Sequence, residues 1–182
     1  MMKLSLLFTI AIAFSILTGC ESPPTGGPIA SESSGPTIEQ LTRAAEPVDI
    51  TQIEAIAGHT VYVPVYSHIY YRNTQQVYNL ATTLSVRNTD LENPLIVTAV
   101  KYYNTEGNLV NSYLEQALKL PPLGSMDFFV EQSNTRGGSG ANFIVEWISE
   151  TALSEPVIEA VMVGVSGTQG LAFTSRGKTI NN

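Results

Sequence analysis

The 182-residue sequence contains one cysteine, Cys20, and two histidines, His59 and His68. A single cysteine cannot form a disulfide within the chain, so the fold must be stabilised by a hydrophobic core. A hydrophobic content of 43% in a chain of this size is enough to build one. Structural zinc sites usually take four nitrogen or sulfur ligands, more than these three residues supply. We therefore expect no metal site and no cofactor.

Positive charge is also scarce. The chain has 9 Lys and Arg against 16 Asp and Glu, a formal net charge of -7. Binding to nucleic acids depends on cationic patches that neutralise phosphates. The charge balance therefore predicts no nucleic-acid partner.

One apolar run is present, from Leu4 to Leu17, and it is shorter than the about 20 residues that a transmembrane helix needs. Lys3 precedes the run, and Thr18, Gly19 and Cys20 follow it, which is the pattern of a secretory signal peptide. The ending Leu-Thr-Gly-Cys resembles the lipobox of bacterial lipoproteins. This resemblance implies a diacylglycerol on the Cys20 sulfur and cleavage of residues 1–19.

The expected location is therefore the bacterial cell envelope, outside the cytoplasm, with the membrane bound through the lipid on Cys20. Glu21 stands where an aspartate would indicate retention in the inner membrane. This favours the periplasmic face of the outer membrane in a cell that has one.

Residues 20–57 are rich in Pro, Gly and Ser at their start, and we interpret them as a flexible tether. Thr37–Gln40 matches a capping box. Asp49–Gly58 is compatible with one or two helical turns or with irregular chain.

Residues 58–182 have the period-two alternation of β-strands. The expected inward-facing residues in this region include Val61, Val63, Val65, Leu80, Leu84, Val86, Ile96, Val100, Tyr102, Met126, Phe128, Val130, Phe143, Val145 and Trp147. Pro64 predicts an edge strand or a bulge. Val157–Val165 is apolar on both faces except at Glu159, which predicts a central strand of undecided phase. The tail from Gly177 is expected to fray.

Short strands separated by turn residues, without a long helical period, predict an all-β fold. We expect an antiparallel immunoglobulin-like β-sandwich of seven or eight strands. A small β-barrel is the alternative.

Four blocks of the sequence resemble a family of bacterial lipoproteins catalogued as domain of unknown function 3124. The blocks are Val63–Ser67, Leu84–Asp90, Gly137–Phe143 and Phe173–Gly177. The likeness covers about residues 58–177 and implies an extracytoplasmic lipoprotein domain without assigned activity or catalytic residues. Leu84–Val100 is also similar to immunoglobulin-like accessory domains, which is a likeness of fold.

A possible recognition face is formed by Tyr62, Tyr66, His68 and Tyr70, which lie opposite the valines of the first strand. Exposed aromatic rows are typical of surfaces that bind proteins, peptides or sugars. The competing interpretation is that these side chains pack beneath the tether or pair across strands. The leading hypothesis is a non-enzymatic binding or structural module with an envelope protein or glycan as its partner.

A second candidate is the loop formed by Arg136, Gly137, Gly138, Ser139 and Gly140, which could bind an anion through its backbone N–H groups. The same loop is close to the G-x-S-x-G nucleophile elbow. It would make Ser139 the nucleophile of an envelope serine hydrolase, with His59 or His68 as the base. The elbow needs a helix after the serine, whereas a strand pattern follows here. We therefore favour a glycine-rich hairpin loop and assign no catalytic residue.

The third candidate is an oxygen-rich cluster, Asp90, Glu92 and Asn93, which could hold Ca²⁺ or make the domain a small-ligand module. These residue types are also common in solvated turns, and we favour that interpretation.

Overall fold

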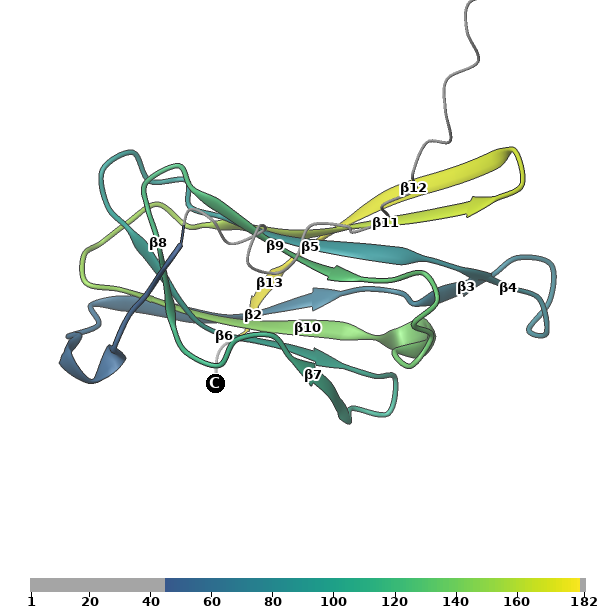
Figure 1. Cartoon of the computed structure of the whole chain (residues 1–182), viewed down its shortest axis with the longest axis horizontal. Coiled ribbons are helices and arrows are strands. Elements are labelled where there is room, and N and C mark those ends of the chain that lie inside the picture. Colours follow the sequence, from purple (N-terminus) through teal and green to yellow (C-terminus); the bar gives the residue numbers. More distant parts are fainter. Residues whose placement is uncertain (1–44, 181–182) are drawn as a thin grey trace, which may run out of the picture. The chain divides into compact units, whose positions relative to one another are not determined.

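The structure is a computed structural model that describes residues 45–180. Cys20, the signal peptide, the capping box at Thr37–Gln40 and most of the predicted tether lie outside the described residues. The described chain is all-β and forms two stacked antiparallel sheets, with neither sheet closed into a barrel in this part (Figure 1). The predicted antiparallel β-sandwich is thus confirmed, but the described part has thirteen strands rather than the expected seven or eight, because several of them are pieces of two to four residues. None of the helices in the described range is long or apolar enough to cross a membrane.

The larger sheet has seven strands in the order β1-β8-β6-β10-β2-β13, with β7 paired to β6. Its strands are β1 (Glu46–Pro47), β2 (Ala57–Pro64), β6 (Leu95–Tyr103), β7 (Leu109–Ser112), β8 (Leu118–Leu120), β10 (Asn142–Ser149) and β13 (Lys178–Ile180).

The second sheet has four strands in the order β12-β11-β5-β9, and a separate two-stranded sheet pairs β3 with β4. Their bounds are β3 (His68–Tyr70), β4 (Val77–Asn79), β5 (Ala81–Arg87), β9 (Ser125–Val130), β11 (Val157–Ser166) and β12 (Gln169–Arg176). Two short 3-10 helices, η1 (Ile50–Gln52) and η2 (Gly138–Gly140), complete the described elements.

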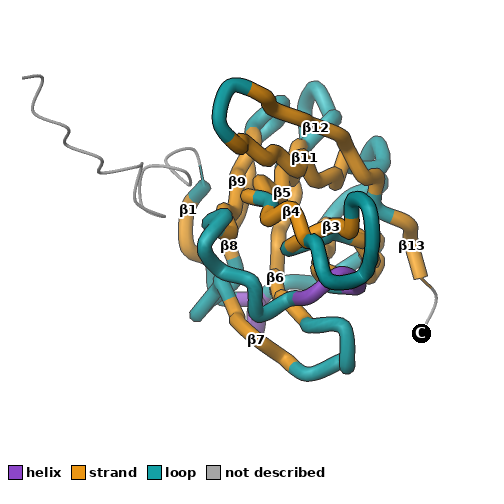
Figure 2. Tube along the Cα trace, turned by 90° about the vertical axis from the view of Figure 1, so that its right-hand side faces the viewer, coloured by secondary structure: helices purple, strands orange, loops and turns teal. Residues whose placement is uncertain are grey.

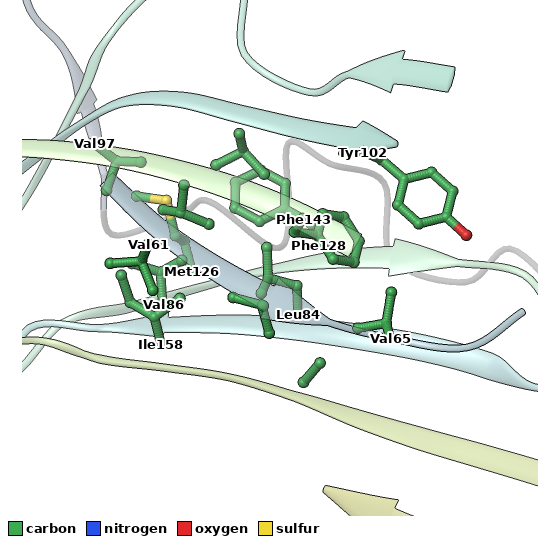
Figure 3. Packing of buried hydrophobic residues seen from close by; sticks show 14 of the residues in the cluster. Val61, Val65, Leu84, Val86, Val97, Tyr102, Met126, Phe128, Phe143 and Ile158 are labelled. Atoms are coloured by element: carbon green, nitrogen blue, oxygen red, sulfur yellow. The ribbon is translucent and has the colours of Figure 1, made fainter. Parts of the chain in front are cut away.

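The core lies between the two sheets. Leu84, Phe128 and Phe143 are fully buried there (Figure 3). Val63 is also fully buried, and Trp147 is nearly so. These residues occupy the alternating positions that the sequence pattern assigned to the inner face. The phase of β11, which the sequence leaves open, follows from the burial of Ile158, Ala160 and Met162. The valines of β11 consequently point outward.

Pro64 ends β2 without placing that strand at an edge, because β2 lies between β10 and β13. Val65 N–H donates to Ala141 O toward β10, so the nitrogen of Pro64 faces the opposite side. On that side β13 pairs with Thr60–Tyr62 and does not extend to Pro64. The proline therefore removes no hydrogen bond from the sheet.

The expected inward position of Ile96 is wrong. The register shifts in β6, so that two residues, Thr98 and Ala99, lie opposite the single residue Glu146. This arrangement is a β-bulge. Leu95 and Val97 therefore join the core cluster in place of Ile96, which is buried outside that cluster.

The folded part begins before the predicted boundary at residue 58. Glu46 pairs with Lys119, and Ile56 N–H donates to Ser149 O. Asp49 caps η1, a single 3-10 turn, by accepting a hydrogen bond from Thr51 N. At the other end, the residues expected to fray from Gly177 instead form β13, whose Thr179 pairs with Val61.

Candidate functional site

The most distinctive surface of the described chain is a group of aromatic side chains, which we name the aromatic end. It consists of Tyr66, His68, Tyr70, Tyr71, Tyr78 and Phe173. The β3–β4 hairpin and the adjacent β11–β12 hairpin carry all of these residues except Tyr66, which precedes β3 (Figure 1). Figure 2 looks at this end and shows β3 and β4 in front of the two main sheets.

The chain leaves the sandwich at this point because of the residues that follow β2. Pro64 ends the strand, and the next residues bring Ser67 into the interior, where its N–H donates to Gly138 O. Ser67 O in turn accepts a hydrogen bond from Leu80 N, the residue between β4 and β5. The first bond holds the start of the β3–β4 hairpin to the loop at Gly138, and the second joins the two ends of the hairpin to each other.

The two hairpins contact each other through aromatic rings and one hydrogen bond. The rings of Tyr66 and Phe173 are 6.1 Å apart between centroids in an edge arrangement. Tyr78 Oη donates to Gln169 O over 3.3 Å. Gly164 makes this close packing feasible, since an added Cβ would lie 2.2 Å from the Tyr78 ring. The aromatic end is therefore a built feature rather than a set of loose loop residues.

Two further ring pairs lie on opposite faces of the β3–β4 hairpin, because Tyr78 pairs with Ile69, the residue between His68 and Tyr70. His68 and Tyr70 are 5.5 Å apart between centroids, and Tyr71 and Tyr78 are 6.4 Å apart. The Arg72 guanidinium lies 5.9 Å from the Tyr71 ring. Tyr66, Tyr70 and Tyr71 are 39%, 51% and 48% exposed, so much of their ring surface is open to solvent. Large aromatic side chains with one open face are the usual anchors of recognition surfaces.

Of the four residues of the predicted recognition face, the structure brings His68 and Tyr70 into contact and places Tyr66 against Phe173. Tyr62 is the exception, because it lies within β2, where it pairs with Ile144 and Lys178 on the outer face of the large sheet. Sequence reasoning missed Tyr71, Tyr78 and Phe173. Their contacts are made between separate hairpins, and only the density of tyrosine in residues 62–78 hinted at them.

The glycine loop at Arg136–Gly140 is held against Thr105. Thr105 Oγ1 donates to Gly137 O and accepts a hydrogen bond from Gly140 N, both over 3.0 Å. Gly138 N donates to Thr135 O. Two of the N–H groups that the predicted anion site would offer are therefore already engaged within the protein.

Gly137 itself packs over a buried pair of hydroxyls. A Cβ at this position would lie 1.9 Å from the Tyr102 hydroxyl oxygen and 2.5 Å from Ser67 Oγ, so no larger residue fits without rearrangement. Burial raises the pKa of Tyr102, and the hydrogen bond to Ser67 and the charge of Arg136 act in the opposite direction. The glycines thus allow the loop to pack closely on the interior.

Ser139 lies in η2, and β10 begins at Asn142, so the turn into a helix that a nucleophile elbow needs is not formed. Within residues 45–180, Ser139 makes no hydrogen bond to either histidine. His59 instead packs edge-on against Trp147 at 5.4 Å, while His68 contacts Tyr70. A serine nucleophile requires a base within hydrogen-bond reach, and this arrangement supplies none.

The carboxylate of the Asp90 cluster already accepts hydrogen bonds from the protein backbone. The Asp90 carboxylate accepts hydrogen bonds from the backbone N–H groups of Glu92, Asn93 and Ser154. These bonds lower the pKa of Asp90 to about 2. The described residues contain no group of three or more His, Cys, Asp and Glu side chains arranged to hold a metal ion.

A groove of about 680 Å³ lies elsewhere, on the large sheet, where Ile56, Thr98, Glu146 and Ile180 contribute to its walls. It is open and shallow, and the Glu146 carboxylate is bonded to Lys101 Nζ at 3.0 Å. We find no set of converging polar groups in it that would define a ligand.

These features define the molecule as a β-sandwich domain whose clearest surface feature is an aromatic end. The chain belongs to the family described as "Protein of unknown function (DUF3124)", which matches residues 58–180. The resemblance to domain of unknown function 3124 is thereby confirmed, while the bacterial lipoprotein nature of the chain stays a prediction. The comparison with curated proteins gives no match.

Among solved structures, the chain is similar to one titled "Crystal Structure of Thermotoga maritima 1070". The identity is 12%, the TM-score is 0.42, and the match covers 66% of this chain and 92% of that chain.

Proposed function

We propose that this protein is a lipid-anchored, non-enzymatic module of the bacterial cell envelope that binds a partner protein or glycan through the aromatic end. The observation that carries the proposal is the group of half-exposed rings held by two interlocking hairpins. Isolated exposed apolar residues are ordinary on protein surfaces, whereas several exposed rings gathered at one end of a domain and held by packing favour an interaction site.

The chemistry of the aromatic end favours a ligand with both apolar and hydroxyl or amide groups. The tyrosines offer flat apolar faces together with hydroxyl groups, and His68 adds a ring that can donate or accept a hydrogen bond. Arg72 is the one formally charged side chain in the segment from Tyr66 to Leu80. A highly charged ligand would find few partners here, while peptide segments and sugars offer matching groups.

The lipobox supports the anchoring half of the proposal. A lipid on Cys20 would tether the domain to the membrane by residues 21–44, which join it to the first described residue. Two or three acyl chains give firm membrane attachment, whereas one gives only marginal binding. The aromatic end would then be presented in the envelope near the membrane surface.

The test is crosslinking in intact cells. The full-length chain carries a photo-activatable residue at position 75, in the exposed turn of the β3–β4 hairpin, and adducts are identified by mass spectrometry and by sedimentation with the cell-wall fraction. We expect one dominant adduct, which is lost when both Tyr66 and His68 are changed to alanine. A Cys20→Ser chain should leave the membrane fraction.

The matched control is Phe129→Ala, which removes an aromatic ring that is 51% exposed on β9, outside the aromatic end. This variant should keep the adduct. Retention of the adduct in the Tyr66 and His68 double variant would exclude the aromatic end as the binding surface. Labelling by a serine-reactive probe that disappears in Ser139→Ala would overturn the non-enzymatic assignment.

A further inference from the structure

The free edge of β12 has a composition that suits pairing with another strand. The strand has eight residues, Gln169–Arg176, and it is an edge of the four-stranded sheet. It contains no proline and no lysine, which are two of the devices that protect natural sheet edges. An unprotected edge of this length is a template for strand addition.

The register of the sheet shows which backbone N–H and C=O groups of β12 point away from β11, toward the free edge. Gly177 N–H donates to Ile158 O, and these two residues continue the pairing of Glu159 with Arg176. Opposite residues alternate between bonded and non-bonded pairs in antiparallel sheets. The backbone N–H and C=O groups of four residues therefore point away from β11: Gly170, Ala172, Thr174 and Arg176.

The same four residues are exposed, while their neighbours Leu171, Phe173 and Ser175 are partly covered. Three of the four have small side chains, so a second backbone can approach without steric conflict. Nothing in residues 45–180 pairs with this side of β12.

We propose that β12 pairs antiparallel with β12 of a second copy of this chain, joining two four-stranded sheets into one across a twofold axis. Self-pairing centred between Ala172 and Thr174 sets these two residues opposite each other. It also places Arg176 opposite Gly170 of the second copy. The single charge of the free edge thus meets a residue without a side chain, and no like charges are brought together.

The opposite edge of the sheet, β9, is shorter and carries a charge in its middle. It has six residues against eight in β12. By the same alternation, Asp127 and Phe129 occupy its free edge. A charged side chain within an edge strand discourages strand addition, whereas Arg176 stands only at the last position of β12.

The outer face next to β12 is partly apolar. Val163 and Val165 of β11 are 40% and 60% exposed, and Ala172 pairs with Val163. Joining two copies at β12 would continue this face across the junction, with both β12 strands between the two β11 strands. It would also bring two aromatic ends close together, because Phe173 belongs to β12.

The test uses the full-length chain in its native membrane, with cysteine introduced at position 172. Two copies of the Ala172→Cys chain, each with a different tag, are produced together, and the membranes are treated with a short bis-maleimide. We expect a crosslinked species of twice the chain mass that carries both tags, with a yield at least tenfold above the unmodified chain. The unmodified chain measures any background from Cys20.

Phe129→Cys, at the opposite edge, should give only that background. Adding Thr174→Lys to the Ala172→Cys chain should abolish the crosslink, whereas Thr83→Lys, on the same face but in an interior strand, should leave it. Circular dichroism confirms that each variant is folded. The proposal is overturned by background-level crosslinking of Ala172→Cys in folded protein, by the absence of any adduct that carries both tags, or by loss of the crosslink in Thr83→Lys alone.

Discussion

The hydroxyl oxygens of Ser67 and Tyr102 lie 2.8 Å apart in the buried interior, although 35 residues separate them in the sequence. Their hydrogen bond connects the segment after β2 with the end of β6, directly beneath Gly137. Both residues are 1% exposed, so water does not readily replace either partner. This pair joins the base of the aromatic end to the core.

We therefore expect that removing either hydroxyl destabilises the fold. Tyr102→Phe leaves Ser67 Oγ buried without its partner, and Ser67→Ala does the same to Tyr102, each costing about 1–3 kcal/mol. The double variant should lose less than the sum, because neither partner then remains unsatisfied. Urea unfolding of the four proteins measures the coupling. Strictly additive losses would show that the two hydroxyls do not interact.

Gly164 is expected to control the position of the β3–β4 hairpin. In Gly164→Ala the new methyl group would overlap the Tyr78 ring, so the ring must move and the Tyr78–Gln169 hydrogen bond is lost. We expect a loss of about 1–3 kcal/mol in the free energy of unfolding and weaker binding at the aromatic end. Gly170→Ala is the matched control on the neighbouring strand, since its Cβ would meet only Gly164 O, at 3.5 Å. Equal behaviour of the two variants would contradict this account.

The lowered pKa of Asp90 predicts that the stability of the fold decreases at acid pH. The backbone N–H groups of Glu92, Asn93 and Ser154 hold the pKa of its carboxyl at about 2, below the usual 3.8. A lowered pKa in the folded state means that the ionised group stabilises the fold above pH 4. This contribution is lost as the pH falls from about 4 through 2.

Asp90→Asn removes the charge and keeps the size of the side chain. We expect its Tm to lie below that of the unmodified chain at pH 7 and the two values to converge toward pH 2. Thermal unfolding followed by circular dichroism across this range measures the difference. A gap in Tm that stays constant down to pH 2 would show that the carboxylate charge does not contribute.

The strand faces could be read from the sequence because side chains alternate with a period of two along any strand. Val63, Phe128 and Phe143 were placed inward by this rule alone, and all three are fully buried. The rule failed at Ile96, because the β-bulge opposite Glu146 depends on how two distant strands pair. A local pattern carries no information about that pairing.

The period-two alternation of the chain and the turn residues between its strands predicted the all-β class, and the four sequence blocks indicated the family. The alternation of tyrosines with valines also showed that Tyr66, His68 and Tyr70 would not lie in the core. Each of these inferences rests on interactions between near neighbours in the sequence or on residue type.

Only the tertiary structure decided that Tyr78 and Phe173 complete the aromatic end and that Tyr62 does not belong to it. It alone also showed that β12 ends the sheet and that no strand within residues 45–180 pairs with its outer edge. The physical reason is that sheet order and hairpin packing arise from contacts between residues far apart in the chain. Those contacts are selected by the packing of the whole domain, and no short stretch of sequence encodes them.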